Sequence, residues 1–238
     1  MKTWLPLLPL TLLLAACDSG PSAPAPTDPP VTQVTGQVDS GTGNGTVELL
    51  DQGMTGSVLA SATVGSDGSF VLPLPAAEKF ASRMVSADSV LGQVGCQGTL
   101  TSSTPGTRGY GFAELRATRS GSVMQVVNLN ADLNLLPPHV AFNGHAWVYT
   151  DQSTLLQGRV DCTKLLNASG TISQLTVDVN VQTRAGWNVI EIAGRTAGVS
   201  LPTTASASAT AIKDFTGSRW RTVTDVARSI TSLSAQAR

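Results

Sequence analysis

Charged and aromatic side chains are scarce in this chain: 13% of its residues are charged and 5% are aromatic. Acidic and basic residues nearly cancel and leave a formal net charge of −1. This balance excludes a nucleic-acid-binding protein that relies on a basic surface. Only 4 lysines and 4 glutamates are present, whereas serine and threonine number 24 and 28. Because exposed helices are rich in lysine and glutamate, the composition predicts a mostly β protein.

The chain also lacks the motifs of common hydrolases and cofactor-binding proteins. It contains no G-x-S-x-G and no H-E-x-x-H sequence, and no lysine and helix follow its glycines as in a phosphate loop. We therefore expect no cofactor and no resident metal ion. The 16 acidic residues offer many pairs, so a carboxylate pair for glycoside cleavage stays open on sequence alone.

The amino-terminal residues 1–16 form a short apolar leader. Lys2 supplies a positive charge, and the apolar run from Leu5 to Leu14 is about half as long as a membrane-spanning helix. The residues Leu14-Ala15-Ala16-Cys17 follow. The whole stretch resembles the signal peptide and lipobox of bacterial lipoproteins. The resemblance implies cleavage before Cys17, lipidation of its thiol and acylation of the new amino terminus, for example with palmitate. The alternative is an ordinary secretory signal with a chance cysteine.

Lipidation of Cys17 would hold the mature chain on a membrane of the cell envelope, facing an extracytoplasmic compartment. Each buried methylene contributes about 0.8 kcal/mol, so several acyl chains anchor a protein firmly. Residues 17–31 then form the anchor and a proline- and serine-rich tether. Beyond the tether we expect a small β unit with a crossover helix at 32–91 and a larger antiparallel β domain at 92–238. The choice of membrane and leaflet stays open.

Four short β-favouring runs, at 35–38, 46–50, 57–64 and 69–74, are separated by glycine-rich turns. The dipeptides Asn44-Gly45 and Asp67-Gly68 are typical of tight hairpins. The sequence V-T-G-Q-V…G-T-V-E-L-L…S-V-L-A-S-A-T-V-G-S-D-G-S-F-V-L-P-L-P, within residues 32–75, resembles the carboxypeptidase regulatory-like, or transthyretin-like, domain. The resemblance implies a seven-stranded sandwich that serves as an accessory scaffold and carries no chemistry.

The remaining chain is expected to add one connecting helix, several strands and one terminal helix. Pro75 favours a first helical turn, so a short helix is predicted within 75–91. Residues 123–133 and 175–182 alternate with a period of two, which predicts half-buried antiparallel strands, and the second is expected to form a hairpin with 187–193. A strand at 199–211, with Pro202 at its start or on an edge, and an amphipathic helix near the carboxyl end complete a fold of antiparallel β-sandwich units.

Two cysteines remain once Cys17 is lipidated. In an extracytoplasmic compartment Cys96 and Cys162 are expected to form a disulfide. The bond would close a long loop, which is worth roughly 4 kcal/mol in the chain-entropy model. The alternatives are two buried thiols or a metal pair, although no C-x-x-C spacing supports a metal site.

The two histidines, His139 and His145, could bind a transition metal together with Asp151. On one extended strand the two imidazoles would share a face but lie about 20 Å apart, so the site requires a bend at Asn143-Gly144. Otherwise they are isolated histidines of a strand or loop. This region is the basis of the alternative function, an envelope hydrolase or metal-binding enzyme.

The residues His145, Trp147 and Tyr149 are spaced by two and would share one strand face. An exposed aromatic ladder of this kind can stack on sugar rings. In a chain with few aromatics, the competing interpretation is that these side chains belong to the core. The leading functional hypothesis is a non-enzymatic, membrane-anchored envelope lipoprotein that binds or scaffolds another envelope component, either a protein or a polysaccharide.

Overall fold

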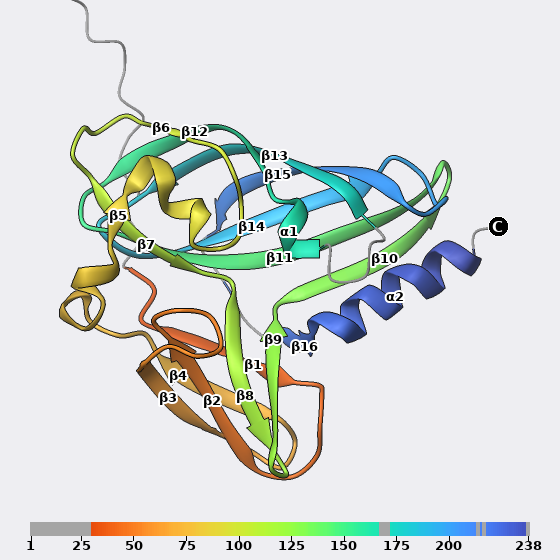
Figure 1. The fold of residues 1–238 in the computed structure, drawn as a ribbon, viewed down its shortest axis with the longest axis horizontal. Helices are drawn as coiled ribbons and strands as arrows, with labels where there is room; N and C mark the ends of the chain where they lie inside the picture. The colour runs from red at the N-terminus through yellow and green to blue at the C-terminus, as the bar shows by residue number, and fades with distance from the viewer. Residues whose placement is uncertain (1–29, 167–171, 213–214, 216–217, 237–238) are drawn as a thin grey trace, which may run out of the picture.

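The computed structural model describes residues 30–166, 172–212, 215 and 218–236, and it is mostly β, as predicted (Figure 1). Cys17, the proposed lipidation site, lies outside the described residues. The strands form a seven-stranded sheet and a nine-stranded sheet. The seven-stranded sheet contains β1 (Gln33–Val38), β2 (Gly45–Leu50), β3 (Val58–Val64), β4 (Ser69–Pro73), β8 (Glu114–Arg119), β9 (Ser122–Val127) and β16 (Arg219–Thr222).

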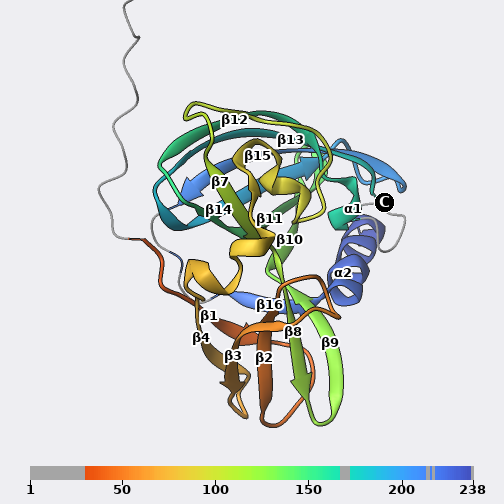
Figure 2. The ribbon, with the colours of Figure 1, turned by 60° about the vertical axis from the view of Figure 1, so that its left-hand side comes forward.

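The strand order of the seven-stranded sheet is β3-β2-β8-β9-β16-β1-β4. The end strands β3 and β4 also contact each other, so the sheet curls into a small barrel-like body (Figure 2). The predicted hairpin around Asp67-Gly68 is only partly correct. Gly68 turns with a φ of 87°, but the strands on either side pair elsewhere, β3 with β2 and β4 with β1. A turn motif specifies the local bend and does not determine which strands pair across it.

Residues 32–91, which were predicted to form a separate β unit, do not form the small body alone. Its strands β8 and β9 come from the middle of the chain, and β16 comes from near the end. Within β1, Gln37 and Val38 pair in parallel with Arg219 and Trp220 of β16. The predicted boundary at 91/92 therefore does not separate the two sheets, because strand periodicity contains no information about distant pairing partners.

The nine-stranded sheet has the order β5-β7-β11-β14-β15-β13-β12-β6, with β10 paired to part of β11. Its strands are β5 (Val85–Ser86), β6 (Thr101–Ser102), β7 (Arg108–Phe112), β10 (Leu129–Leu135), β11 (Pro138–Thr150), β12 (Thr154–Asp161), β13 (Ile172–Thr183), β14 (Gly186–Thr196) and β15 (Thr203–Ile212). The predicted hairpin of 175–182 with 187–193 is wrong, because β15 lies between β13 and β14 and pairs with both. The strand β15 begins directly after Pro202, as the sequence suggested, but occupies an interior position.

Two ribbons of chain connect the sheets and form a fork. The strands β8 and β9 pair with each other in the small body, and their continuations β7 and β10 then pair with different parts of β11. The single strand predicted at 123–133 is broken at Asn128, where the chain passes from one sheet to the other. Asn128 is buried, and its Nδ2 donates a hydrogen bond of 3.0 Å to the carbonyl of Arg219.

The helices cover the edges of the sheets. The predicted helix at 75–91 is replaced by the short 3₁₀ turns η1 (Ala77–Lys79), η2 (Ala81–Arg83) and η3 (Ala87–Gly92). A single α-helical turn, α1 (Thr163–Leu166), follows β12. The predicted carboxyl-terminal helix is present as α2 (Val223–Gln236), and its buried residues Val226 and Ile230 pack against Val140 of β11. This apolar stripe at helical spacing is the signal that identified it.

Candidate functional site

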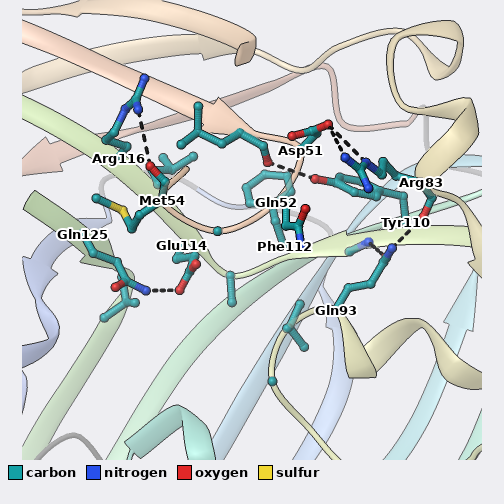
Figure 3. A pocket seen from close by; sticks show the side chains of 18 of the residues that line it. Asp51, Gln52, Met54, Arg83, Gln93, Tyr110, Phe112, Glu114, Arg116 and Gln125 are labelled. Carbon is teal, nitrogen blue, oxygen red and sulfur yellow. Dashed lines mark hydrogen bonds and ion pairs between the residues drawn. The ribbon is translucent and has the colours of Figure 1, made fainter. Parts of the chain in front are cut away.

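A cavity of about 950 Å³, lined by both polar and apolar side chains, lies at the waist between the two sheets, where β7 leads into β8. We call it the waist groove. Figure 3 shows its side chains, which reach it from the loop after β2, the turn η2, the segment after η3 and the ribbon β7–β8. Its lining includes Asp51, Gln52, Met54, Arg83, Gln93, Tyr110, Glu114, Arg116, Gln125 and Lys164.

Ion pairs fix the walls of the waist groove. Arg83 donates from Nε and Nη2 to Oδ2 of Asp51, at 3.1 and 3.0 Å, and so connects η2 to the loop after β2. Arg116 binds Glu48 at 2.7 Å across the β2–β8 pair and also donates to the carbonyl of Met54 at 3.4 Å. Both pairs hold the loop at 51–54 in place. A preformed cavity of this kind binds a ligand without first ordering its own walls.

The amide of Gln93 supports the opposite wall. Its Oε1 accepts a hydrogen bond of 2.8 Å from the backbone N–H of Gly111, and its Nε2 donates to the carbonyl of Arg83 at 2.7 Å. The Tyr110 hydroxyl donates to the carbonyl of Leu50 at 3.1 Å. Burial raises the pKa of Tyr110 to about 12, and the Asp51 carboxylate adds to this rise. The phenol therefore stays neutral at physiological pH and acts as a hydrogen-bond donor.

A short length of unpaired strand edge lines the waist groove. Glu114 and Leu115 pair with β9 on one side. On the other side, pairing with β2 begins only at Arg116, and pairing with β5 ends at Gly109. Within the described chain, residues 113–115 therefore have no strand partner on that second side. An unpaired edge can accept an added strand through its main-chain groups.

Two acidic and three basic side chains line the waist groove, and Glu48, which pairs with Arg116 without lining the groove, brings the sum of the charges to zero. The Glu114 carboxylate accepts a hydrogen bond from the Gln125 side-chain amide, and the ion pairs of Asp51 and Glu48 neutralise two arginines. Lys164 of α1 also lines the groove and is exposed. Among the described residues, no three His, Cys, Asp or Glu side chains lie close enough together to hold a metal ion. The arrangement is suited to binding a largely neutral, extended ligand.

The residues His139, His145 and Asp151 do not converge. They follow one another along β11 and its end, and on a continuous strand each interval of six residues spans about 20 Å. Nδ1 of His139 contacts the carbonyl of Pro137 at 2.7 Å, whereas Nδ1 of His145 contacts Oδ1 of Asn128 at 2.6 Å. Asp151 accepts a hydrogen bond from the Arg108 backbone at 2.8 Å. The bend at Asn143-Gly144 that a shared site requires is not present.

The residues His145, Trp147 and Tyr149 do share one face of β11, but this face is turned toward the small body. The His145 ring contacts Phe215, and Tyr149 contacts Phe80. The Trp147 side chain is 0% exposed and stacks on Phe112, with ring centroids 5.4 Å apart. The sugar-stacking hypothesis is therefore wrong for Trp147, because its ring surface is already buried in the core between the sheets.

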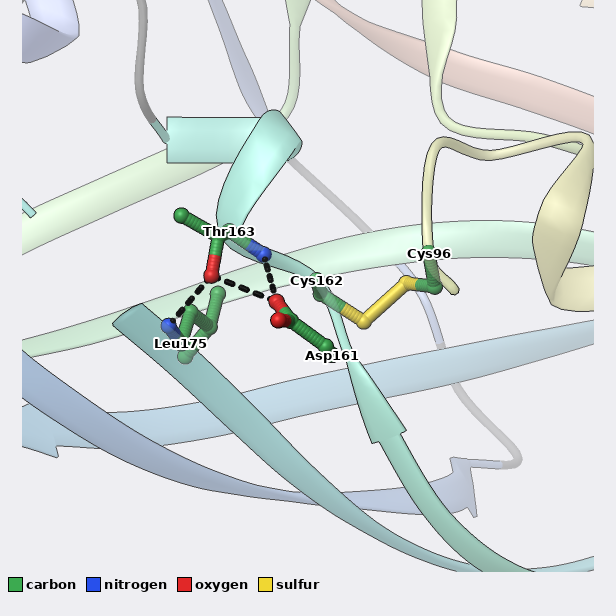
Figure 4. Close-up of a disulfide and its surroundings, with 5 residues drawn as sticks. All are labelled: Cys96, Asp161, Cys162, Thr163 and Leu175. Carbon is green, nitrogen blue, oxygen red and sulfur yellow. Dashed lines mark hydrogen bonds between the residues drawn. A yellow bond between two sulfur atoms is a disulfide. The ribbon is translucent and has the colours of Figure 1, made fainter. Parts of the chain in front are cut away.

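The predicted disulfide joins Cys96, after η3, to Cys162, after β12 (Figure 4). The two Cα atoms are 4.1 Å apart, and both residues are buried in the core of the large sheet. Cys162 is followed by α1, whose Thr163 accepts a hydrogen bond of 2.9 Å from the backbone of Leu175. The bond thus fastens the segment that supplies Gln93 to the large sheet and supports one wall of the waist groove.

Sequence reasoning did not identify the waist groove. Asp51, Arg83 and Gln93 belong to three separate loops or turns, and none is part of a recognised motif. The only local signal was the departure from strand periodicity at 51–56 and 76–100, which marks long connections rather than a site.

No described helix is long and apolar enough to cross a membrane. The lipobox and the transthyretin-like resemblance of residues 32–75 stay predictions. Comparison of the chain with family models, with curated proteins and with solved structures finds no significant match.

Proposed function

We propose that this protein is a lipid-anchored envelope lipoprotein that acts as a non-enzymatic binding module, and that the waist groove binds an extended segment of another envelope protein. The single observation that carries the binding proposal is the unpaired strand edge at 113–115 inside a preformed groove of about 950 Å³. This volume lies within the range of about 300–1,000 Å³ that is typical of ligand pockets. A strand edge recognises polypeptide backbone directly, whereas a polysaccharide offers no matching ladder of amide groups.

One feature of the sequence supports the anchor, and one feature of the structure supports export from the cytoplasm. The residues Leu14-Ala15-Ala16-Cys17 match a lipobox at every position. The disulfide between Cys96 and Cys162 fits a protein that folds outside the reducing cytoplasm. The structure attaches the end of the predicted tether to the folded body, because the Val31 N–H donates to the carbonyl of Trp187 at 3.1 Å. In the proposed arrangement the part of the tether before Pro30 separates the body from the bilayer by up to about 3.1 Å per residue where it is extended.

The anchor is tested by fatty-acid labelling in intact cells. Wild-type protein should incorporate labelled palmitate, and mass spectrometry should place the lipid on Cys17 as the first residue of the mature chain. The variant Cys17→Ser should lose the label and leave the membrane fraction. A Cys17→Ser variant that keeps both the label and its membrane association would contradict the lipoprotein proposal.

The groove is tested by site-specific photo-crosslinking in intact cells. A photoreactive side chain replaces Gln52, which is exposed and lines the waist groove, or Gln157, which is exposed on β12. We expect a discrete protein adduct from position 52 and none from position 157. Equal adducts from both positions would show non-specific capture. An adduct from position 52 that contains polysaccharide rather than peptide would contradict the choice of ligand.

A further inference from the structure

A second polar cavity of about 590 Å³ lies where β16 enters α2. The strand β9 lines the waist groove with Gln125 and Val127, and its continuation β10 lines this second cavity with Asn130. We call it the arginine pocket and define it by Asp39, Arg219, Arg221, Asp225, Arg228 and Ser229. Three guanidinium groups and two carboxylates line it, so the pocket has an excess of one positive charge in a chain whose formal net charge is −1.

Both carboxylates of the arginine pocket already have partners. Asp39 pairs with Arg219 at 3.0 Å, and Asp225 pairs with Arg228 at 3.0 Å. The second oxygen of Asp225 accepts hydrogen bonds from the hydroxyls of Ser40 and Thr222, at 2.8 and 2.7 Å. These bonds keep the pKa of Asp225 below its ordinary value, with the Thr222 hydroxyl as the largest cause. The Asp225 carboxylate is therefore ionised, and both of its oxygens already accept hydrogen bonds.

Arg221 differs from the other two arginines. It is half-buried, and its Nη2 donates a hydrogen bond of 2.7 Å to the Ser229 hydroxyl. Among the described residues Arg221 forms no direct ion pair, although its charge is one of the causes that lower the pKa of the nearby Asp225. A guanidinium has five N–H donors, so Arg221 keeps donors for a ligand that enters the cavity.

We infer that the arginine pocket binds a phosphate group, held by Arg221 and by the exposed Arg228 at its rim. Arg228 is paired with Asp225 through Nη1 only, so its remaining N–H groups can face the phosphate. The Ser229 hydroxyl accepts a hydrogen bond from the Arg221 guanidinium and so holds this side chain in position. A guanidinium fork matches two oxygens of a phosphate, and charge-assisted hydrogen bonds of this type are about twice as strong as neutral ones. The phosphate is either a free small anion or the headgroup of an anionic phospholipid. This site is separate from the waist groove and does not depend on the proposed protein partner.

The test follows the side-chain Nε–Hε signals of the arginines by NMR in the full mature chain, held in detergent micelles. Inorganic phosphate should shift the Arg221 and Arg228 signals in a saturable way. The variant Arg221→Gln should weaken phosphate binding about tenfold, as expected for the loss of a charge-assisted contact. Arg228→Gln, which changes an exposed helix residue and leaves the core intact, should also weaken it.

The matched control is Arg159→Gln, because Arg159 is an exposed arginine paired with Asp178 on the far part of the large sheet. This variant should bind phosphate as wild type does. Titration with short-chain phosphatidylglycerol, and with phosphatidylcholine as the zwitterionic comparison, distinguishes the two sources. If phosphatidylglycerol displaces phosphate and phosphatidylcholine does not, the ligand is a lipid headgroup. If phosphate binds and neither lipid displaces it, the ligand is a small anion. Absence of saturable phosphate binding, or an equal loss in Arg159→Gln, overturns the inference.

Discussion

Trp147 of β11 stacks on Trp220 of β16, with ring centroids 5.3 Å apart and an interplanar angle of 21°. Both side chains are 0% exposed. The first belongs to the large sheet and the second to the small body, so this pair joins the two sheets. Gly36 of β1 lies directly against Trp220, and a Cβ atom at that position would come within 2.6 Å of the indole ring. The waist of the molecule is therefore a tightly packed joint.

Substitution of Trp147 by alanine is expected to destabilise the whole fold. Removing a buried indole leaves a large cavity and costs about 3–5 kcal/mol of unfolding free energy. Chemical denaturation followed by circular dichroism measures the loss. Val71→Ala, at an exposed position on β4, is the control and should change stability little. An unfolding free energy for Trp147→Ala close to that of wild type would show that the stacked joint contributes nothing.

Arg119 should be more important for stability than its charge suggests. It is 3% exposed and donates to the backbone carbonyls of Val38, Gly43 and Ser66 at 2.8–3.1 Å. Lysine cannot reproduce this fork of donors, so Arg119→Lys should lower the unfolding free energy by about 2 kcal/mol. Arg159→Lys, at a fully solvent-exposed ion pair, should change the unfolding free energy far less. Similar losses in the two variants, measured by denaturation, would refute this role.

Loss of the disulfide should destabilise the chain by roughly 4 kcal/mol, because the bond closes a loop with a sequence separation of 66 residues. The double variant Cys96→Ala/Cys162→Ala and the reduced wild-type protein should unfold at the same lowered temperature. Reductant should have no effect on the double variant. A wild-type midpoint that does not respond to reduction would contradict the expected contribution.

Stability should fall as the pH drops below about 6.5, and His145 is one cause. Burial lowers its pKa in the folded state, while the Glu191 carboxylate partly opposes the shift. The unfolded chain then binds a proton more readily than the folded chain, so stability is complete above pH 6.5 and is lost toward the lower folded-state pKa. His145→Gln should flatten this dependence in denaturation experiments between about pH 5 and 7. His139→Gln, near the start of β11, is the matched histidine replacement against which the effect of His145→Gln is compared.

The sequence predicted the elements of this fold better than their connections. Regular alternation at 175–182 and the helical spacing of Val226 and Ile230 identified β13 and α2, because burial of one face imposes a period. The break at Asn128 was missed, since an asparagine within an alternating run fits a continuous strand equally well. The position of β15 between β13 and β14 depends on long-range packing, which no local pattern records.

The candidate site was even less accessible from the sequence. The spacing of His145, Trp147 and Tyr149 correctly placed them on one face, but periodicity alone could not show that the small body covers that face. The waist groove exists only because the ribbons β7–β8 and β9–β10 separate at β11. A groove that forms between two diverging pairs of strands leaves no recognisable sequence pattern in any single segment.

The most direct test of the binding proposal is amide hydrogen exchange at residues 111–116, with and without the segment of the partner that is captured by crosslinking at position 52. Strand addition hydrogen-bonds the free edge, so exchange should slow when the segment binds at those amides of 113–115 that point to this edge and not to β9. Exchange in β12, which does not line the waist groove, should stay the same. Unchanged exchange at 113–115, with new protection elsewhere on the surface, would show that the waist groove is not the binding site.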